Sequence, residues 1–377
     1  MTAPAERQGP LRVFMTADAV GGVWQYALDL AAGLKSHGVE TILAVLGPRP
    51  SAEQRRRAAA VAGEVIETDL PLDWTACRPG EVEEASWAVA RLATEGEPDV
   101  VHLNSPALAA SPVFPAPVVG VAHSCVATWW AANRTGPLPP EFAWRMDMTG
   151  RGYRAADAVT APTAAFAEAT RRAYGLERAP TVVRNGRHAP RRATAARKPF
   201  VFTAGRLWDD GKNLAALDRA AGRLSAPVLA AGPLQGPNGA CVTLAHAQAL
   251  GRLDGDRIAE HLSAQPVFAS VARYEPFGLA VLEAAQAGCA LVLSDIPTFR
   301  ELWDGAATFV PPEDDEALVQ RLEQLLGDPV GRDRLGRAAR QRSRAYRVET
   351  MSAAMLAVYR SLLVPRVAVT PLEDAAA

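Results

Sequence analysis

Short runs of β-branched and other apolar residues alternate with helical patterns along most of the chain. Between the first two runs, Val23, Ala27, Leu30 and Leu34 form one apolar stripe with helical spacing, and Gly38 ends the helix. This rhythm predicts a parallel sheet with crossover helices. The runs that we interpret as strands of the first half are residues 11–16, 39–46, 100–103, 118–122, 158–161 and 181–183.

The rhythm breaks at residues 184–198, which contain six basic residues, Pro190 and no apolar period. Such a stretch is typical of an interdomain linker. The pattern then resumes, with strands at 200–203, 228–231, 267–269 and 290–293 and with helices from Asn213, near 256–263, from Phe277 and on to about Leu363. We therefore predict two α/β halves, with a ligand bound in the cleft between them, outside the carboxyl ends of the strands.

The composition excludes several kinds of partner and site for this protein. Among 377 residues, 40 basic and 41 acidic side chains give a net charge of −1, so neither nucleic acid nor an acidic membrane is an expected bulk partner. Four widely spaced cysteines argue against a zinc site or a disulfide framework. The N-terminus lacks a signal-peptide pattern, and four prolines interrupt the uncharged stretch 100–133. We expect a cytoplasmic protein. Any anion site in it must come from a few nearby groups, because the overall charge is close to zero.

Two glycine-containing loops each lead from a strand into a helix. Gly21 and Gly22 would let an anion approach the helix N-terminus, or would simply form a tight turn. The loop 205–213 has the wrong glycine spacing for a nucleotide-binding P-loop, and Asn213 stands where the magnesium-binding hydroxyl would be. Arg206 and Lys212 in this loop could neutralise a diphosphate without metal, or could be two solvated cations.

The strongest motif lies at residues 273–288. Pro276 fits the first turn of a helix that is apolar or small on every side except at Glu283 and Gln286. A buried Glu283 needs hydrogen-bond donors, and ribose hydroxyls would serve. Glu275 lies eight residues earlier, up to ~12 Å away along a helix, which can bridge ribose and hexose of a nucleotide sugar. The alternative is that Glu275 is only a charge at the helix N-terminus and that Glu283 forms a salt bridge in the core.

At these residues the chain resembles the retaining glycosyltransferases of family 4, which carry a Glu-x7-Glu motif like Glu275 and Glu283. The resemblance extends over nearly the whole chain through the segments Gly21-Gly22, Val100-Val101-His102, His123-Ser124, Asn185-Gly186, Gly205-Arg206-Leu207, Lys212-Asn213, Ser294-Asp295-Ile296-Pro297 and Glu301.

The resemblance implies a GT-B fold, in which two Rossmann-like domains face each other across a cleft and a C-terminal helix crosses back to the first domain. The implied division is an N-terminal acceptor domain (1–185), a linker (186–199), a C-terminal donor domain (200–345), the returning helix (346–364) and a mobile tail (365–377).

The resemblance also implies roles for individual residues. Arg206 and Lys212 would hold the diphosphate and Glu283 the ribose, while Glu275 with the amides after it, and His123, would approach the donor sugar. For His123 the alternative is a core histidine bonded to backbone. The implied catalytic residues are Glu275, His123, Arg206 and Lys212, and the implied donor-binding residues are Gly22, Arg206, Lys212, Arg252, Leu253, Glu275, Phe277, Gly278, Leu279 and Glu283.

The implied reaction is a retaining transfer by same-face attack, with a UDP- or GDP-sugar as co-substrate and with no metal or other cofactor. Positive side chains and amides would stabilise the departing diphosphate. The acceptor, whether a small molecule, a glycan or a lipid-linked compound, is not identified. The hinge at 183–187 departs from the family pattern, because no proline precedes Asn185.

Three rival hypotheses stay open. Asp254 and Asp256 have the spacing of a metal-binding D-x-D motif, although cap residues before a helix explain them better. A sugar-nucleotide epimerase would share the fold. A non-catalytic sugar-nucleotide or membrane-binding protein would use the seven arginines of 331–347 for, at most, peripheral contact with acidic lipid.

Overall fold

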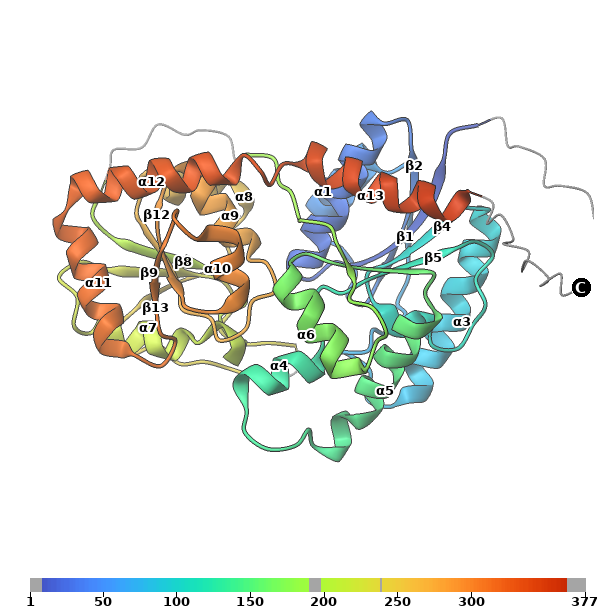
Figure 1. The fold of residues 1–377 in the computed structure, drawn as a ribbon, viewed down its shortest axis with the longest axis horizontal. Coiled ribbons are helices and arrows are strands. Elements are labelled where there is room, and N and C mark those ends of the chain that lie inside the picture. Colours follow the sequence, from blue (N-terminus) through green and yellow to red (C-terminus); the bar gives the residue numbers. More distant parts are fainter. Residues whose placement is uncertain (1–8, 190–197, 238, 365–377) are drawn as a thin grey trace, which may run out of the picture.

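The computed structural model describes residues 9–189, 198–237 and 239–364 as two lobes side by side (Figure 1). Each lobe contains one parallel sheet with helices between its strands. This arrangement confirms the predicted α/β class with two Rossmann-like domains. The predicted mobile tail, 365–377, and most of the linker lie outside the described residues.

The N-terminal sheet has seven parallel strands in the order β3-β2-β1-β4-β5-β6-β7. The strands are β1 (Arg12–Asp18), β2 (Glu40–Leu46), β3 (Glu64–Glu67), β4 (Val100–Leu103), β5 (Val118–Val121), β6 (Ala158–Ala161) and β7 (Thr181–Val182). The helices are α1 (Gly22–Ser36), α2 (Ala52–Val61), α3 (Pro79–Gly96), the 3-10 helix η1 (Pro106–Ala109), α4 (Val126–Asn133), α5 (Pro140–Ala155) and α6 (Ala164–Tyr174).

The C-terminal sheet has six parallel strands in the order β10-β9-β8-β11-β12-β13. The strands are β8 (Val201–Ala204), β9 (Val228–Ala231), β10 (Gln248–Gly251), β11 (Val267–Ser270), β12 (Ala290–Ser294) and β13 (Thr308–Val310). The helices are the 3-10 helix η2 (Asp210–Lys212), α7 (Leu214–Ala221), α8 (Gly255–Ser263), α9 (Leu279–Ala287), α10 (Pro297–Trp303), α11 (Asp315–Gly327), α12 (Pro329–Ser343) and α13 (Val348–Leu363).

The last helix, α13, leaves the C-terminal lobe and packs on α1 of the N-terminal lobe (Figure 1). Met355 and Tyr359 are fully buried there, in one hydrophobic cluster with Leu30. A Cβ atom at Gly33 would lie 2.6 Å from Cβ of Ser352, so only glycine allows the two helices to come this close. The N-terminal domain therefore completes its core with the C-terminal end of the chain.

The chain crosses between the lobes twice, and the two crossings lie against each other. The hinge after β7 passes the segment between α12 and α13, where the N–H of Arg187 donates to the carbonyl of Tyr346 at 3.3 Å. Among the described residues, no helix is both long enough and apolar enough to cross a lipid bilayer.

Candidate active site

The loop after β8 carries both cations that the sequence assigns to a diphosphate. Asp209 organises this loop, because its Oδ1 accepts the N–H of Gly211 at 2.9 Å. Nη2 of Arg206 lies 3.2 Å from Oδ2 of the same carboxylate. Lys212 forms an ion pair with Glu275, which precedes α9. Each cation is thus held by a carboxylate.

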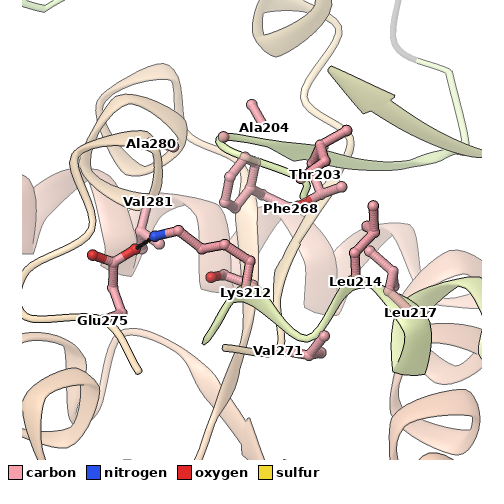
Figure 2. Close-up of a pocket in the computed structure, with 13 residues that line it drawn as sticks. Thr203, Ala204, Lys212, Leu214, Leu217, Phe268, Val271, Glu275, Ala280 and Val281 are labelled. Carbon is pink, nitrogen blue, oxygen red and sulfur yellow. Dashed lines mark hydrogen bonds and ion pairs between the residues drawn. The ribbon is translucent and has the colours of Figure 1, made fainter. Parts of the chain in front are cut away.

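The Lys212–Glu275 pair lies in a small hollow beside the ends of β8 and β11. Figure 2 shows the Lys212 side chain extended toward Glu275, next to Val281 of α9. The side chains of the pair are only 21% and 15% exposed. The hollow is lined by Thr203, Ala204, Gly205, Leu207, Lys212, Leu214, Leu217, Phe268, Ser270, Val271, Glu275, Ala280 and Val281.

The segment between Glu275 and α9 is a loop, so the prediction that Pro276 lies in the first helical turn is wrong. The helix begins at Leu279, and Gly278 before it has φ of 89°, a left-handed conformation that glycine adopts without strain. The carbonyl of Glu275 accepts a hydrogen bond from Oγ1 of Thr298 at 2.7 Å. Helical spacing consequently does not set the separation of the two glutamates.

Three other residues that the sequence assigns to donor-sugar binding do not place their side chains in the hollow. The Phe277 ring is buried in the C-terminal core, 5.7 Å from the ring of Tyr346, so only its backbone is available to a ligand. Arg252 is exposed after β10, and Leu253 is half-buried against the C-terminal core. Neither of the latter two lines the hollow.

The glycine loop of the N-terminal domain, Gly21 and Gly22, faces Arg206 and Leu279 of the other domain. A Cβ atom at Gly21 would lie 3.7 Å from Cδ of Arg206, and one at Gly22 would lie 3.6 Å from Cδ1 of Leu279. The N-terminal ends of α1 and α9 therefore meet between the two domains, where both point unpaired amide groups toward one region.

Glu283 lies on the same face of α9 as Leu279, and in this structure an arginine of the hinge is its partner. Nη1 of Arg187 is 2.5 Å from Oε1 of Glu283, and Nε of Arg187 is 3.6 Å from Oδ2 of Asp29 on α1. Burial raises the pKa of Glu283, although Arg187 opposes that effect. The arrangement matches the salt-bridge alternative in the free protein and leaves ribose binding untested.

His123 follows β5 at the carboxyl edge of the N-terminal sheet. Its Nε2 lies 2.7 Å from Oδ1 of Asn104, so its partner is a side chain rather than backbone. The ring of Tyr26 packs edge-on against it at 4.5 Å. Burial lowers the pKa of His123 to about 3, and His102 adds to this effect, so the imidazole is neutral at physiological pH.

Hydrogen bonds from two parts of the N-terminal domain reach the C-terminal domain. At one, Nε1 of Trp129 in α4 donates to Oδ1 of Asp209 at 3.0 Å. At the other, Glu301 of α10 accepts the N–H groups of Ala164 and Ala165 at 2.8 Å each, at the start of α6. Glu301 also pairs with Arg184. The N-terminal domain thus contacts both the 205–213 loop and α10 of the C-terminal domain.

Sequence reasoning did not identify Asp209, Arg187 and Asn104 as site residues. Asp209 could have been suspected, since an Asp two residues before a glycine often accepts that glycine's N–H. Arg187 and Asn104 carry no such local signal, because their partners come from other elements of the fold.

Asp254 caps α8, since its Oδ1 accepts the N–H of Arg257 at 2.8 Å. This cap is the role that the sequence favours for the first aspartate of the D-x-D spacing.

Asp18, the last residue of β1, is a buried carboxyl whose effect on stability should depend on pH. Burial raises the pKa of Asp18 to about 6, with Asp73 adding to the shift and the N–H of Val20 and Arg206 opposing it. The pKa of Asp18 is higher in the folded protein than in the unfolded chain, so folding favours the protonated carboxyl. The stability that this gives is fully present below the unfolded pKa and is lost as the pH rises through about 6. Asp18→Asn should therefore stabilise the fold at pH 7.5 by roughly 2–3 kcal/mol.

Urea unfolding of wild type and Asp18→Asn at several pH values checks this expectation. The difference should shrink steadily as the pH falls below 6. A constant difference from pH 4.5 to 7.5 would show that Asp18 does not titrate as described.

Two family models match the chain, one in each domain. A model described as Glycosyltransferase Family 4 matches residues 20–191, and one described as Glycosyl transferases group 1 matches residues 238–342. The second match includes the Glu275–Glu283 segment.

Similar proteins include one sequence relative and two solved structures. A glycogen synthase of Mycobacterium tuberculosis is 27% identical over 86% of each chain. The solved sucrose-phosphate synthase of Thermosynechococcus elongatus superposes with a TM-score of 0.75 at 18% identity, covering 93% of this chain and 99% of that one. Anabaena HepE in complex with UDP-glucose gives a TM-score of 0.71 at 17% identity, covering 93% and 100%.

Proposed function

The chain belongs to the family 4 glycosyltransferases of GT-B type, and on that basis we propose that it transfers a sugar from a nucleotide-diphosphate donor to an acceptor hydroxyl, with retention and without a metal ion. The observation that carries the proposal is the Lys212–Glu275 ion pair in the hollow beside β8 and β11. This pair would offer a cation to the diphosphate and a carboxylate to the sugar hydroxyls.

Donor binding would exchange the partners of both cations. The diphosphate would take Lys212 from Glu275 and Arg206 from Asp209, because phosphate oxygens carry more charge than one carboxylate. Glu275 would then be free to accept hydrogen bonds from the sugar. Asp209 would keep its bonds to Trp129 and Gly211, so the loop would hold its shape.

The two cations and the amides at the start of α9 would stabilise the charge that develops on the departing diphosphate. The acceptor hydroxyl attacks from the face that the diphosphate leaves, and a phosphate oxygen takes its proton. No side chain then needs to act as a general base. The UDP-glucose complex of HepE favours a UDP-sugar as the first donor to test.

The test is a donor screen with the full chain. UDP- and GDP-sugars are first ranked by thermal shift, since a ligand that binds the folded state raises its stability. The best donor is then incubated with an acceptor panel, and the anomeric configuration of the product is read by NMR. We expect a product with the donor's configuration and an unchanged rate in excess EDTA.

The Glu275→Gln variant supplies the internal control, since it should lose turnover while retaining most of its affinity for UDP. An inverted product, or a rate that EDTA abolishes and Mn²⁺ restores, would contradict the proposal.

A further inference from the structure

A chain of buried hydrogen bonds runs from the last helix to His123. Oη of Tyr359 in α13 is 2.8 Å from Nδ1 of His102, and Nε2 of His102 is 3.1 Å from Oδ1 of Asn104. The same Oδ1 is 2.7 Å from Nε2 of His123. Tyr359 and His102 are completely buried, and Asn104 is 9% exposed. Two imidazoles thus share one amide oxygen in the protein interior.

The main chain of Thr16 fixes which way the Asn104 amide points. Nδ2 of Asn104 is 2.7 Å from the carbonyl oxygen of Thr16, and a carbonyl can only accept. The amide group therefore turns its NH₂ toward Thr16 and its Oδ1 toward the two imidazoles. The backbone N–H of Asn104 also donates to Oγ1 of Thr16 at 3.1 Å, which holds the residue against β1.

This orientation determines the protons on both rings. Oδ1 of Asn104 can only accept, so Nε2 of His102 and Nε2 of His123 must each carry a proton. In a neutral imidazole the other nitrogen is then an acceptor. Nδ1 of His102 accepts the hydroxyl proton of Tyr359, which completes the chain. Burial lowers the pKa of His102 to about 4 and that of His123 to about 3, in agreement with two neutral rings.

Nδ1 of His123 has no bonding partner within the part of the chain that the structure describes. Tyr26 restrains the ring, since it packs edge-on against His123 at 4.5 Å and stacks on His102 at 6.1 Å. The ring is therefore fixed in its plane and in its tautomer, with one acceptor nitrogen left over.

We propose that Asn104, supported by His102 and Tyr359, is a positioning residue that holds His123 as the Nε2–H tautomer, so that Nδ1 accepts a hydrogen bond from a hydroxyl of the donor sugar. The sugar contact rests on the proposed function, whereas the tautomer does not. The C-terminal helix thereby takes part in arranging the N-terminal side of the cleft.

The first experiment measures the tautomer of His123 by ¹⁵N NMR in histidine-labelled full-length protein, without any substrate. The His123→Gln variant assigns the signal among the six histidines. We expect a protonated Nε2 and an unprotonated Nδ1 at pH 7. A protonated Nδ1 would overturn the proposal directly.

The second experiment compares Asn104→Leu with Thr160→Val. Asn104→Leu removes the shared acceptor, so His123 should populate both tautomers and kcat should fall about tenfold, the value of one hydrogen bond. Thr160→Val removes a buried hydroxyl of β6 that has no hydrogen-bond partner among the described residues, and it should leave the tautomer and kcat near wild type. Equal effects of both variants on kcat, with an unchanged tautomer, would reduce Asn104 to a structural role.

Tyr359→Phe keeps the test informative if Asn104→Leu does not fold. It should shift the tautomer signals of His102, whereas Tyr153→Phe, which removes a buried hydroxyl without a hydrogen-bond partner, should not. Identical His102 signals in both variants would count against the proposed series of hydrogen bonds from Tyr359 to His123. The expected tautomers in a protein that transfers no sugar would refute the proposed function and leave the positioning chain intact.

Discussion

Replacing Lys212 with methionine is expected to lower kcat/KM by about 10²–10³-fold, the usual cost of removing one charged or oriented donor from a developing anion. Methionine preserves much of the side-chain length and removes the positive charge. UDP affinity should fall as well, because Lys212 would contact the diphosphate in both the bound and the reacting state. Isothermal titration with UDP and initial-rate kinetics measure the two effects separately.

Lys198→Met is a suitable control, because Lys198 is exposed and its substitution removes the same charge from a different part of the chain. Thermal unfolding of both variants separates folding from binding, since Lys212→Met leaves the Glu275 carboxylate unpaired. Wild-type UDP affinity in a folded Lys212→Met protein would refute the diphosphate site.

Glu283→Gln should weaken UDP binding by about 10- to 100-fold, because hydrogen bonds from ribose hydroxyls to a charged carboxylate contribute roughly 1.5–3 kcal/mol. The same substitution leaves Arg187 with only the more distant Asp29 as a charged partner, so some loss of stability is also expected. UDP titration and urea unfolding follow these two consequences independently.

Pyrophosphate distinguishes the two roles of Glu283, because it binds the same cations and has no ribose. A ribose contact predicts that Glu283→Gln loses affinity for UDP and keeps its affinity for pyrophosphate. Equal losses for both ligands would mean that the Arg187–Glu283 pair only holds the domains together.

The strands that the sequence predicts are those with continuous apolar runs, and the structure places them with little change at their ends. The three strands that the pattern did not predict are β3, β10 and β13, and each lies at the edge of a sheet. An edge strand has one unpaired side and is less covered by helices; β3 and β10 have no fully buried residue. Such strands lack the apolar run on which the prediction depends.

The candidate site also contains contacts that local sequence patterns could not predict. Local motifs brought Lys212 and Glu275 into one hypothesis, and the structure places these two in contact. The pairing of Glu283 with Arg187 was not predictable, because it depends on where the hinge passes between α1 and α9. The bond between Tyr359 and His102 joins residues 257 positions apart. Contacts of this kind follow from topology, which local patterns do not record.

The position of α13 has a consequence for biosynthesis. The C-terminal core is complete at Tyr346, whereas the N-terminal core includes Met351, Met355 and Tyr359. A ribosome must therefore deliver nearly the whole chain before the first domain can bury its last apolar surface. Domains commonly fold in the order in which they are translated. Here the domain that is translated second can reach its native packing first, and the earlier one waits for the final helix.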